Sequence, residues 1–407
     1  MRRGSLRGTL GSSDVMRIRH VVPSYLPAVR YGGPIFAVHG LCRALATRGH
    51  HVEVFTTNVD GPNNSAVPLR CPVALDGIHV RYFPSEYFRR LYWSPPLARA
   101  LDADLADFTV LHLHSVFLWP TWAAARRARN ARVPYLISPR GMLIKDLIQR
   151  KNRLVKSAWL KLIEKSSLER ASAVHVTSEL EAEELQRFGW LLPRVATIPN
   201  GIDEVVRFGE HEVSSDVKEV AVGQPLILFL GRISWKKGLD RLLNAFALTH
   251  REKLAIVVPD DEKLVPRLVQ RARELQITDR VRFLPRIVPR IVLSPDREYL
   301  YRSANMFVLP PYSENFGNSV LEAMQRAVPV VITPEVGAVD IVRQSGGGLI
   351  AAGDAEPLSA AICRLAADPA LARSIGEAGQ RHTTAHYTWA QIAARMEGLY
   401  GSLRCCG

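Results

Sequence analysis

Two glutamates and two basic residues carry the clearest chemical signal in this sequence. Glu314 and Glu322 lie eight positions apart in SENFGNSVLEAM, with an Asn-Phe-Gly-Asn turn between them. Upstream, LFLGRISWKKG places Arg232 and Lys237 directly after an apolar run. Arginine binds oxygens in two places and lysine adds a point charge, so this pair suits a diphosphate. Carboxylates repel phosphate and accept hydrogen bonds from hydroxyls, so we expect Glu314 to face a sugar ring and Glu322 a ribose diol.

The segment between the glutamates predicts a helix whose first-turn amides are free. The helix is expected to begin near Gly317, with Asn315 and Asn318 as capping residues, and such amides bind anions. The spacing of a P-loop is absent. Taken singly, each glutamate reads more simply as a capping or surface acid, and the basic loop as a solvated one. Together, in this order, these residues favour a functional site.

The elements that must position these residues follow a regular alternation. Short apolar, β-rich runs occur in the first half at residues 17–24, 51–57, 110–115, 135–140, 173–178 and 194–200. They resume in the second half at residues 225–232, 254–260, 280–285, 305–311 and 329–333. Helical text follows most of them, which predicts parallel strands joined by crossover helices. We expect an α/β protein with two doubly wound domains and ligands in the cleft between them.

The same pattern sets the expected domain limits. An N-terminal domain is expected over residues 16–203 and a C-terminal domain over 204–385. An amphipathic helix over 387–403 either caps the second domain or crosses back to the first. Residues 1–15 are basic but lack an apolar stretch, so we interpret them as a disordered leader rather than a secretory signal.

Composition places the chain among ordinary globular proteins. It has 407 residues, of which 47% are hydrophobic and 23% charged. No apolar run reaches the roughly 18 residues that a transmembrane helix requires. The five cysteines are odd in number and scattered, without disulfide or zinc-ligand spacing, and this fits a reducing compartment. A cytoplasmic protein is therefore expected.

Basic residues are concentrated in the first half of the chain. Residues 1–200 contain 28 Lys and Arg against 15 Asp and Glu, whereas residues 201–407 contain 25 against 24. This asymmetry indicates an anionic partner. Residues 140–170 hold nine basic and three acidic residues among apolar ones at helical spacing. They predict either a helix on an anionic membrane surface or a packed helix with a solvated basic face. No nucleic-acid-binding motif is present, so nucleic acid is not expected as a partner.

Two residues at strand ends are candidates for contacts with the second substrate. His114 closes the run VLHLH, and Arg140 follows YLISP. Their place at the carboxyl ends of expected strands favours contact with a sugar or an acceptor. We expect one of His112 and His114 to face away from the other, and a buried core histidine is the plainer alternative for His114.

The ordered set of motifs resembles the retaining glycosyltransferases of family 4, which adopt the GT-B fold: two Rossmann-like domains facing across a cleft, with the last helix returning to the first domain. The resemblance extends from about Met16 to about Tyr400. Besides the Glu-x7-Glu pair, the motifs that carry it are YGGP (31–34), HLHSVFLWP (112–120), SPRGML (138–143), NGID (200–203), GRISWKKG (231–238) and YTW (387–389). It implies that residues 386–407 belong with the N-terminal domain.

The resemblance also implies roles for individual residues. The catalytic set would be Glu314, His114, Arg232 and Lys237. The donor-binding set would be Gly32, Gly33, Asn315, Phe316, Gly317, Asn318 and Glu322. Arg140 would lie on the acceptor side. Protein cations would replace a metal ion, and no cofactor is expected beyond the nucleotide-diphospho-sugar donor.

The implied reaction is transfer of a hexosyl group to a saccharide or to a polyprenyl-diphosphate-linked saccharide, with retention of anomeric configuration. Such an enzyme could lie peripherally on the cytoplasmic face of a membrane. The alternatives are another sugar-nucleotide enzyme of this fold, such as an epimerase or a phosphorylase, and a sugar-binding protein without catalysis. Residues 257–262 (VVPDDE) and 285–296 depart from the family pattern and bear on the choice of base or sugar.

Overall fold

The computed structural model describes residues 15–30, 32–150, 158–257, 262–284 and 294–404. All of the expected leader except Val15 lies outside the described residues. So do most of the two segments that depart from the family pattern.

The N-terminal half forms an eight-stranded sheet in the order β10-β9-β8-β7-β1-β2-β6-β5. All neighbouring pairs are parallel except the edge pair β5 (Pro72–Leu75) and β6 (Ile78–Phe83). The chain winds outward from β1 in one direction and then crosses to β7 on its other side, which makes the sheet doubly wound. The remaining strands are β1 (Arg17–Val22), β2 (His51–Thr57), β7 (Val110–His114), β8 (Tyr135–Ser138), β9 (Ala173–Val176) and β10 (Val195–Thr197).

The second half repeats this plan in a six-stranded parallel sheet, ordered β13-β12-β11-β14-β15-β16. Its strands are short, and the central ones are entirely buried, as expected where helices cover both faces. The strands are β11 (Leu226–Leu230), β12 (Lys253–Val257), β13 (Val281–Leu284), β14 (Met306–Leu309), β15 (Val330–Ile332) and β16 (Gly348–Ile350). The prediction of two doubly wound parallel sheets is confirmed.

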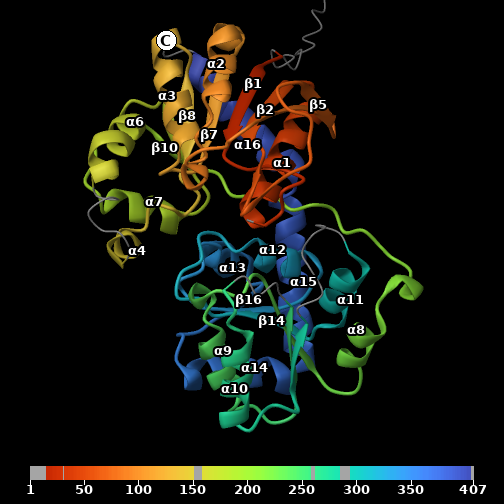
Figure 1. Ribbon diagram of the computed structural model, residues 1–407. Helices are drawn as coiled ribbons and strands as arrows, with labels where there is room; N and C mark the ends of the chain where they lie inside the picture. Colours follow the sequence, from red (N-terminus) through yellow and green to blue (C-terminus); the bar gives the residue numbers. More distant parts are fainter. Residues whose placement is uncertain (1–14, 31, 151–157, 258–261, 285–293, 405–407) are drawn as a thin grey trace, which may run out of the picture.

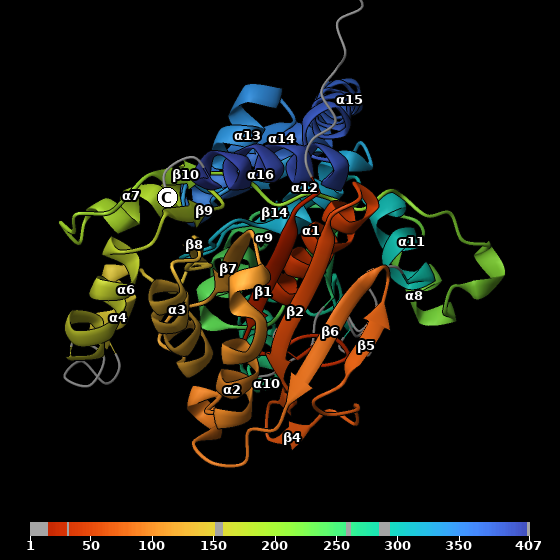
Figure 2. The same ribbon diagram turned by 90° about the horizontal axis from the view of Figure 1, so that it is seen from above.

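Figures 1 and 2 show the helices of each half gathered around its own sheet. In the first half they are α1 (Gly33–Thr47), α2 (Pro95–Asp104), α3 (Trp119–Ala131), α4 (Lys145–Arg150), η3 (Leu160–Glu164), α6 (Lys165–Glu169) and α7 (Glu179–Gln186). In the second they are α8 (Ser215–Val220), η5 (Trp235–Lys237), α9 (Leu239–Phe246), α10 (Val265–Glu274), α11 (Pro295–Ser303), α12 (Asn318–Gln325), α13 (Val339–Ser345), α14 (Ala355–Ala367) and α15 (Pro369–His386).

The last helix, α16 (Trp389–Arg404), lies against α1 of the N-terminal half rather than on the C-terminal sheet, as both ribbon views show. Trp389 fits over Gly40, where a Cβ atom would come within 2.2 Å of the indole. Further along, the Tyr400 hydroxyl reaches His112 on β7, at 2.8 Å from Nδ1. Of the two arrangements that the sequence leaves open for this helix, the structure shows the return to the first half.

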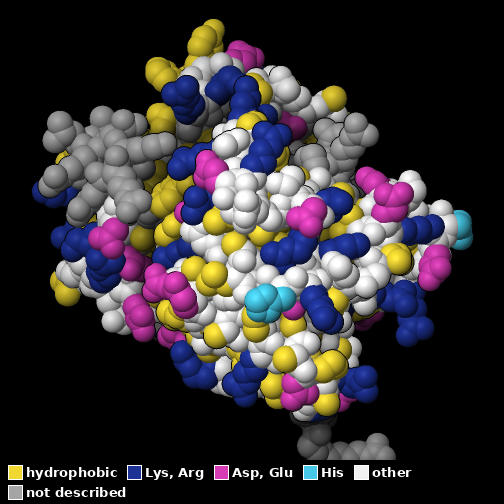
Figure 3. Space-filling view, turned by 90° about the horizontal axis from the view of Figure 1, so that it is seen from below, with side chains coloured by type: hydrophobic (Ala, Val, Ile, Leu, Met, Phe, Trp, Pro, Cys, Tyr) yellow, Lys and Arg dark blue, Asp and Glu magenta, His cyan; other side chains and the backbone are white. Residues whose placement is uncertain are grey.

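No helix among the described residues combines the length and the apolar content needed to cross a bilayer. Figure 3 shows the molecule from below, where Lys and Arg side chains are interspersed with Asp and Glu. This face therefore carries no extended field of one sign.

Candidate active site

A cavity of about 340 Å³ lies between the two sheets and is lined from both. Loops after the carboxyl ends of β1, β8 and β10 contribute from one side, and those after β11 and β14 from the other. Its lining includes most of the residues expected from the sequence to act together: Gly32, Gly33, Arg140, Arg232, Lys237, Glu314, Asn315, Gly317, Asn318 and Glu322. His114 and Phe316 do not line it.

The basic loop after β11 carries its cations into this cavity. Lys237 ends the short helix η5, and its ammonium pairs with the Glu314 carboxylate. The next residue, Gly238, has φ 65°, and a Cβ there would lie 1.9 Å from the Pro310 carbonyl oxygen. Only glycine fits so tight a passage, so the loop is fixed where it presents Lys237. Arg232 reaches across to the Gly32 loop of the N-terminal half. A Cβ atom on Gly32 would lie 3.8 Å from the Arg232 side chain.

The helix α12 begins at Asn318, next to the expected position. Its N-cap is Gly317, with φ 93° and no side-chain capping hydrogen bond. The expectation that Asn315 and Asn318 cap this helix is therefore wrong. Both side chains instead contact the other half of the molecule. The first-turn amides at the cavity wall have no side-chain cap, and this arrangement suits an anion.

Two asparagines connect the two halves at the cavity. The Asn315 side-chain amide donates to Thr177 Oγ1 at 2.9 Å, and the backbone carbonyl oxygen of Asn315 accepts from Ser178 Oγ at 2.9 Å. Asn200 Nδ2 donates to Asn318 Oδ1 at 2.9 Å. The loop that holds Glu314 is thus fixed against α7 of the N-terminal half.

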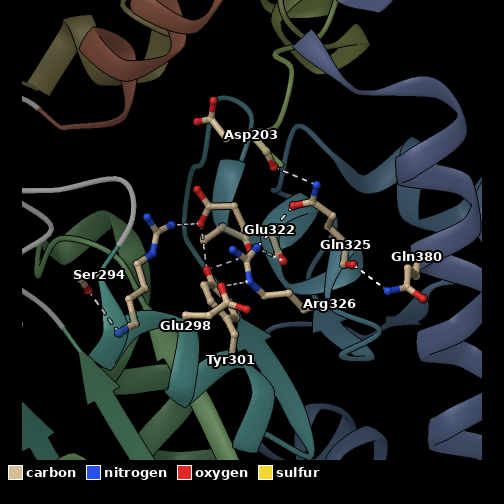
Figure 4. A network of polar contacts seen from close by, with 10 residues as sticks. Asp203, Ser294, Glu298, Tyr301, Glu322, Gln325, Arg326 and Gln380 are labelled. Atoms are coloured by element: carbon tan, nitrogen blue, oxygen red, sulfur yellow. Dashed lines mark hydrogen bonds and ion pairs between the residues drawn. The ribbon is translucent and has the colours of Figure 1, made fainter. Parts of the chain in front are cut away.

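Glu322 is held by a polar network around α11 and α12 (Figure 4). Arg297 forms an ion pair with its Oε2, and the Tyr301 hydroxyl donates to the same oxygen at 2.9 Å. Burial alone would raise the pKa of Glu322, but the Arg297 guanidinium and this hydrogen bond keep the pKa below its usual value. Glu322 is therefore an ionised acceptor of fixed orientation at the cavity wall.

The same network continues to the junction between the two halves. Gln325 Nε2 donates to the Asp203 carbonyl at 2.8 Å, and Gln380 Nε2 donates to the Gln325 carbonyl at 3.0 Å (Figure 4). The Asp203 carboxylate pairs with Arg43 on α1. Helix α12, which carries Glu322, is therefore linked through hydrogen bonds to the N-terminal half.

His114 lies beneath the cavity wall, with 1% of its surface exposed. Its Nε2 lies 2.9 Å from His20 Nδ1, and its Nδ1 faces Arg140 Nη2 at 3.4 Å. A guanidinium can only donate, so His114 Nδ1 accepts and its Nε2 carries the proton toward His20. Burial and the neighbouring Arg140 hold the pKa of His114 well below 6.5. His114 is a neutral residue that contacts Arg140 and does not line the cavity.

The expectation that His112 and His114 face apart is wrong. Their ring centroids lie 4.0 Å apart, because side chains two positions apart on a strand point to the same face. His112 instead belongs to a second chain of hydrogen bonds. It accepts from Tyr400 and donates to Ser138 Oγ at 2.6 Å, and Ser138 donates to His175 Nδ1 at 2.7 Å. His175 Nε2 then donates to the Ile198 carbonyl at 2.8 Å, and this acceptor fixes every proton in the chain.

His20, His112 and His114 offer nitrogen atoms within 4.8 Å of one another, so we asked whether they suit a metal ion. Hydrogen bonds already engage both nitrogens of His112 and of His114. The Arg140 cation beside His114 would also repel a divalent ion. The donor set therefore fits a hydrogen-bonded core better than a metal centre.

One expected site residue, Phe316, and two unexpected ones, Arg297 and Trp389, complete the description. Phe316 is 3% exposed, and its carbonyl accepts from Ala338 N at 2.8 Å, so it holds the loop from beneath. Arg297 and Trp389 line the cavity although the sequence did not single them out as site residues. Arg297 lies at the third position of α11, in a segment without a recognised motif. The YTW motif was noted, but only as the start of a helix.

Comparison with known proteins agrees with this geometry. Residues 32–201 match the family model described as glycosyl transferase 4-like domain, and residues 210–382 match the one described as glycosyl transferases group 1. A D-inositol 3-phosphate glycosyltransferase of Catenulispora acidiphila is 30% identical over 416 aligned residues, covering 94% of this chain and 92% of that protein. The mannosylfructose-phosphate synthase of Agrobacterium fabrum is 24% identical, covering 92% and 87%.

Solved structures show the same arrangement of domains. A sucrose-phosphate synthase from Thermosynechococcus elongatus superposes with a TM-score of 0.73 at 25% identity, covering 96% of this chain and 100% of that one. The Anabaena protein HepE, solved with UDP and glucose, superposes with a TM-score of 0.72 at 18% identity, covering 95% and 100%. The fold is thus GT-B, the two-domain architecture of sugar-nucleotide enzymes. The chain belongs to the family 4 glycosyltransferases, and it is a hexosyltransferase that uses a nucleotide sugar.

Proposed function

We propose that this enzyme transfers a hexosyl group with retention of configuration and without a metal ion, from a nucleotide-diphospho-sugar to a saccharide or a lipid-linked saccharide. The observation that carries the proposal is the grouping of Arg232, Lys237 and the uncapped start of α12 around Glu314 in one cavity. Two cations and a helix N-terminus match the charge of a diphosphate, and the carboxylate matches sugar hydroxyls.

The Lys237–Glu314 ion pair gives this site a simple response to its donor. A diphosphate competes for the Lys237 ammonium, and Glu314 is then released to accept from hydroxyls of the hexose. As the bond between the anomeric carbon and the diphosphate breaks, negative charge develops on the phosphate oxygen that held the sugar. The sugar becomes oxocarbenium-like at the same time. Arg232, Lys237 and the amides of Gly317 and Asn318 stabilise that charge without a metal ion.

Glu322 is proposed to bind the ribose of the donor. It is ionised and oriented, and both of the hydrogen-bonded contacts described above fall on Oε2. Its remaining oxygen is the proposed acceptor for a ribose hydroxyl. His114 acts in this scheme as a positioning residue for Arg140, because it contacts that guanidinium from below.

Retention follows if the acceptor hydroxyl attacks from the face that the diphosphate leaves. The departing phosphate is itself a base of suitable position, so we assign no enzyme nucleophile and no covalent intermediate. Arg140 lines the cavity on the N-terminal side and donates to Asn200 Oδ1 at 2.9 Å. We place the acceptor between the two halves, within reach of Arg140 and of its neighbour Gly141.

A peripheral position at the cytoplasmic face of a membrane is part of the proposal. Within the basic segment 140–170, Leu162 is 78% exposed and lies between Lys161 and Lys165, which are also exposed. An apolar side chain flanked by cations suits an anionic lipid surface. Sedimentation with vesicles of anionic lipid at low salt tests this, with Leu162→Asp as the variant. If the same amount of protein stays in the supernatant with and without vesicles, the protein does not bind the lipid surface. That result would favour a soluble acceptor.

The remaining alternatives are an epimerase or phosphorylase of the same fold, and a sugar-binding protein without catalysis. Family membership supports transfer over both. Thermal-shift screening against UDP, GDP and ADP and then their sugars would identify the donor. Release of the nucleoside diphosphate, followed by NMR of the product's anomeric proton, then tests retention. A product of inverted configuration, or turnover that requires a divalent ion, would contradict the proposal.

A further inference from the structure

A second cavity, of about 620 Å³, opens on the other side of the Glu314 loop. It shares with the first cavity the residues Gly141, Ile144, Ser313, Glu314 and Asn315. A molecule in it would therefore lie directly beside the carboxylate proposed to contact the donor sugar. Its other lining residues are Leu143, Asp146, Leu180, Glu181, Glu184, Trp235, Tyr312, Pro334 and Glu335.

Two partly exposed aromatic rings form the C-terminal side of this cavity. Trp235 is 41% and Tyr312 40% exposed, and their ring centroids lie 6.4 Å apart. Tyr312 is held in place, because its hydroxyl donates to Asp240 at 2.7 Å and the Arg241 guanidinium covers its ring at 3.9 Å. Rigid rings that remain exposed are available to stack on the apolar face of a ligand.

The charged side chains of the lining are carboxylates, beside the neutral polar residues Ser313 and Asn315, and among the described residues no lysine or arginine lines it. Asp146 and Glu184 are both paired with Arg187, at 3.1 and 2.7 Å. Glu335 pairs with Arg241 at 3.6 Å through Oε1, while its Oε2 is buried and has no hydrogen-bond partner among the described residues. A carboxylate oxygen without a partner beside a cavity can accept from a ligand hydroxyl once the side chain turns toward it.

This wall is rigidly connected to the donor site. The Glu314 amide donates to the Glu335 carbonyl at 3.0 Å, and the Gly337 amide donates to the Glu314 carbonyl at 2.9 Å. A ring bound against Glu335 would thus be held at a fixed distance from the sugar to be transferred. Fixed positioning of two reactants is what a bimolecular transfer requires.

We infer that this second cavity binds an uncharged sugar ring of the acceptor. The inference rests on the proposed transferase function and narrows its acceptor class. A pyranose has an apolar face for Trp235 and Tyr312 and hydroxyls for the carboxylates. A phosphorylated ring would meet carboxylates and, among the described residues, no lysine or arginine of the lining, so this cavity disfavours it.

The test uses the full chain, the donor found by the thermal-shift screen, and a panel of methyl and p-nitrophenyl hexosides with their 6-phosphates. Transfer and donor hydrolysis are followed separately through the nucleoside diphosphate and the glycoside product. Neutral hexosides are expected as acceptors and their 6-phosphates to be at least ten-fold poorer. Trp235→Ala and Tyr312→Ala should each raise the acceptor KM about ten-fold, with the donor KM and donor hydrolysis within two-fold of wild type.

Three variants serve as controls. Trp235→Phe keeps a ring and should recover most of the acceptor affinity. Tyr87→Ala removes an aromatic ring that is more exposed, at 67%, and lines neither cavity, and it should change nothing. Glu335→Gln tests the unpaired oxygen and should weaken acceptor binding less than loss of either ring. Unchanged acceptor KM in both alanine variants, or a preference for the 6-phosphates, would overturn the inference.

A binding measurement separates this inference from the proposed function. Saturation-transfer NMR with the neutral methyl hexosides reports contact with the protein even without turnover. Binding that is lost in Trp235→Ala but accompanied by no transfer from any donor would support the sugar cavity and contradict the transferase mechanism. Transfer that proceeds while Trp235→Ala binds and reacts as wild type would support the transferase and contradict this cavity's role.

Discussion

The two sides of the cleft are built on different electrostatic principles. On the C-terminal side, each acid is paired with a cation: Glu314 with Lys237 and Glu322 with Arg297. On the N-terminal side, Arg140 contacts the neutral His114 and donates to Asn200, and it has no salt bridge to a described carboxylate. The first side holds its charges in balance until a ligand competes for them. The second presents a cation, Arg140, with which no described carboxylate forms a salt bridge.

The difference also shows in how protonation couples to stability. Ion pairs keep Glu322 ionised although it is largely covered. The histidines remain neutral because burial disfavours their charged forms, which lowers the pKa of His20 and of His175 to about 3. The stability of the C-terminal side therefore depends on Glu322 remaining ionised. The stability of the N-terminal side depends on its buried histidines remaining neutral.

The largest effect is expected from the cations of the C-terminal side. Lys237→Ala and Arg232→Ala should each lower kcat about 100- to 1,000-fold, because each removes stabilisation of charge that develops on the diphosphate. Initial rates of nucleoside diphosphate release measure this. Arg373→Ala, an exposed arginine on α15 that lines neither cavity, is the control. Wild-type rates in both cavity variants would contradict the assigned roles.

The next effect is expected on stability, from breaking the ion pair between Arg297 and Glu322. Arg297→Ala leaves Glu322 without its partner and should lower the free energy of unfolding by roughly 3 kcal/mol. The double variant Arg297→Ala/Glu322→Ala removes both charges and should recover part of that loss. Urea denaturation at pH 7.5 measures the wild type, Arg297→Ala, Glu322→Ala and the double variant. The ion pair predicts that the double variant loses less free energy of unfolding than the two single variants lose together. A loss equal to or larger than that sum would contradict the pairing.

The histidine side predicts an acid-sensitive stability. Between the pKa of unfolded histidine, 6.5, and the folded value of about 3, the unfolded chain binds a proton that folded His20 does not. The free energy of unfolding should therefore fall as pH drops below 6.5, by about 1.4 kcal/mol per pH unit for each such histidine. His20→Asn keeps an acceptor for His114. It should remove the contribution of one histidine to this pH dependence, which is about 2 kcal/mol of unfolding free energy between pH 7 and 5. The exposed His211→Asn is the control, and equal slopes in all three proteins would contradict this.

The smallest effect on stability is expected at Arg140. Arg140→Met removes a cation without a carboxylate partner, so the free energy of unfolding should stay within about 1 kcal/mol of wild type, while the acceptor KM rises. Arg19 offers the matched contrast, because it is buried and bonded to Glu53 and Asp104, each at 2.7 Å. Arg19→Met should cost several times more stability. Equal losses in the two variants would mean that Arg140 is as fully paired as Arg19.

Much of the fold could be predicted because buried parallel strands are continuous apolar runs. The strands that the prediction missed lack this feature. In β6, Ile78–Phe83, polar residues alternate with apolar ones, and its neighbour β5 begins with a proline at the sheet edge. The strand β16 has only three residues, one of them glycine. Pairing with β2 and β15, rather than local sequence, determines these elements.

The candidate site was predictable where neighbouring residues share one loop. Glu314 to Glu322 and Arg232 to Lys237 are each a single stretch of chain at the end of a strand. The partners that fix them come from elsewhere. Arg297 reaches Glu322 from α11, and Thr177 holds Asn315 from the N-terminal half. Such contacts depend on how two sheets face each other, and no local spacing encodes that.

The return of α16 to the first half has a consequence for biosynthesis. Residues 16–203 leave the ribosome long before residues 389–404, yet Trp389 and Tyr400 complete the packing of that first half. The apolar surface of α1 that α16 covers therefore stays exposed in the nascent N-terminal half while the whole second half is translated. A chain that stalls during this interval would expose that surface to chaperones or to aggregation.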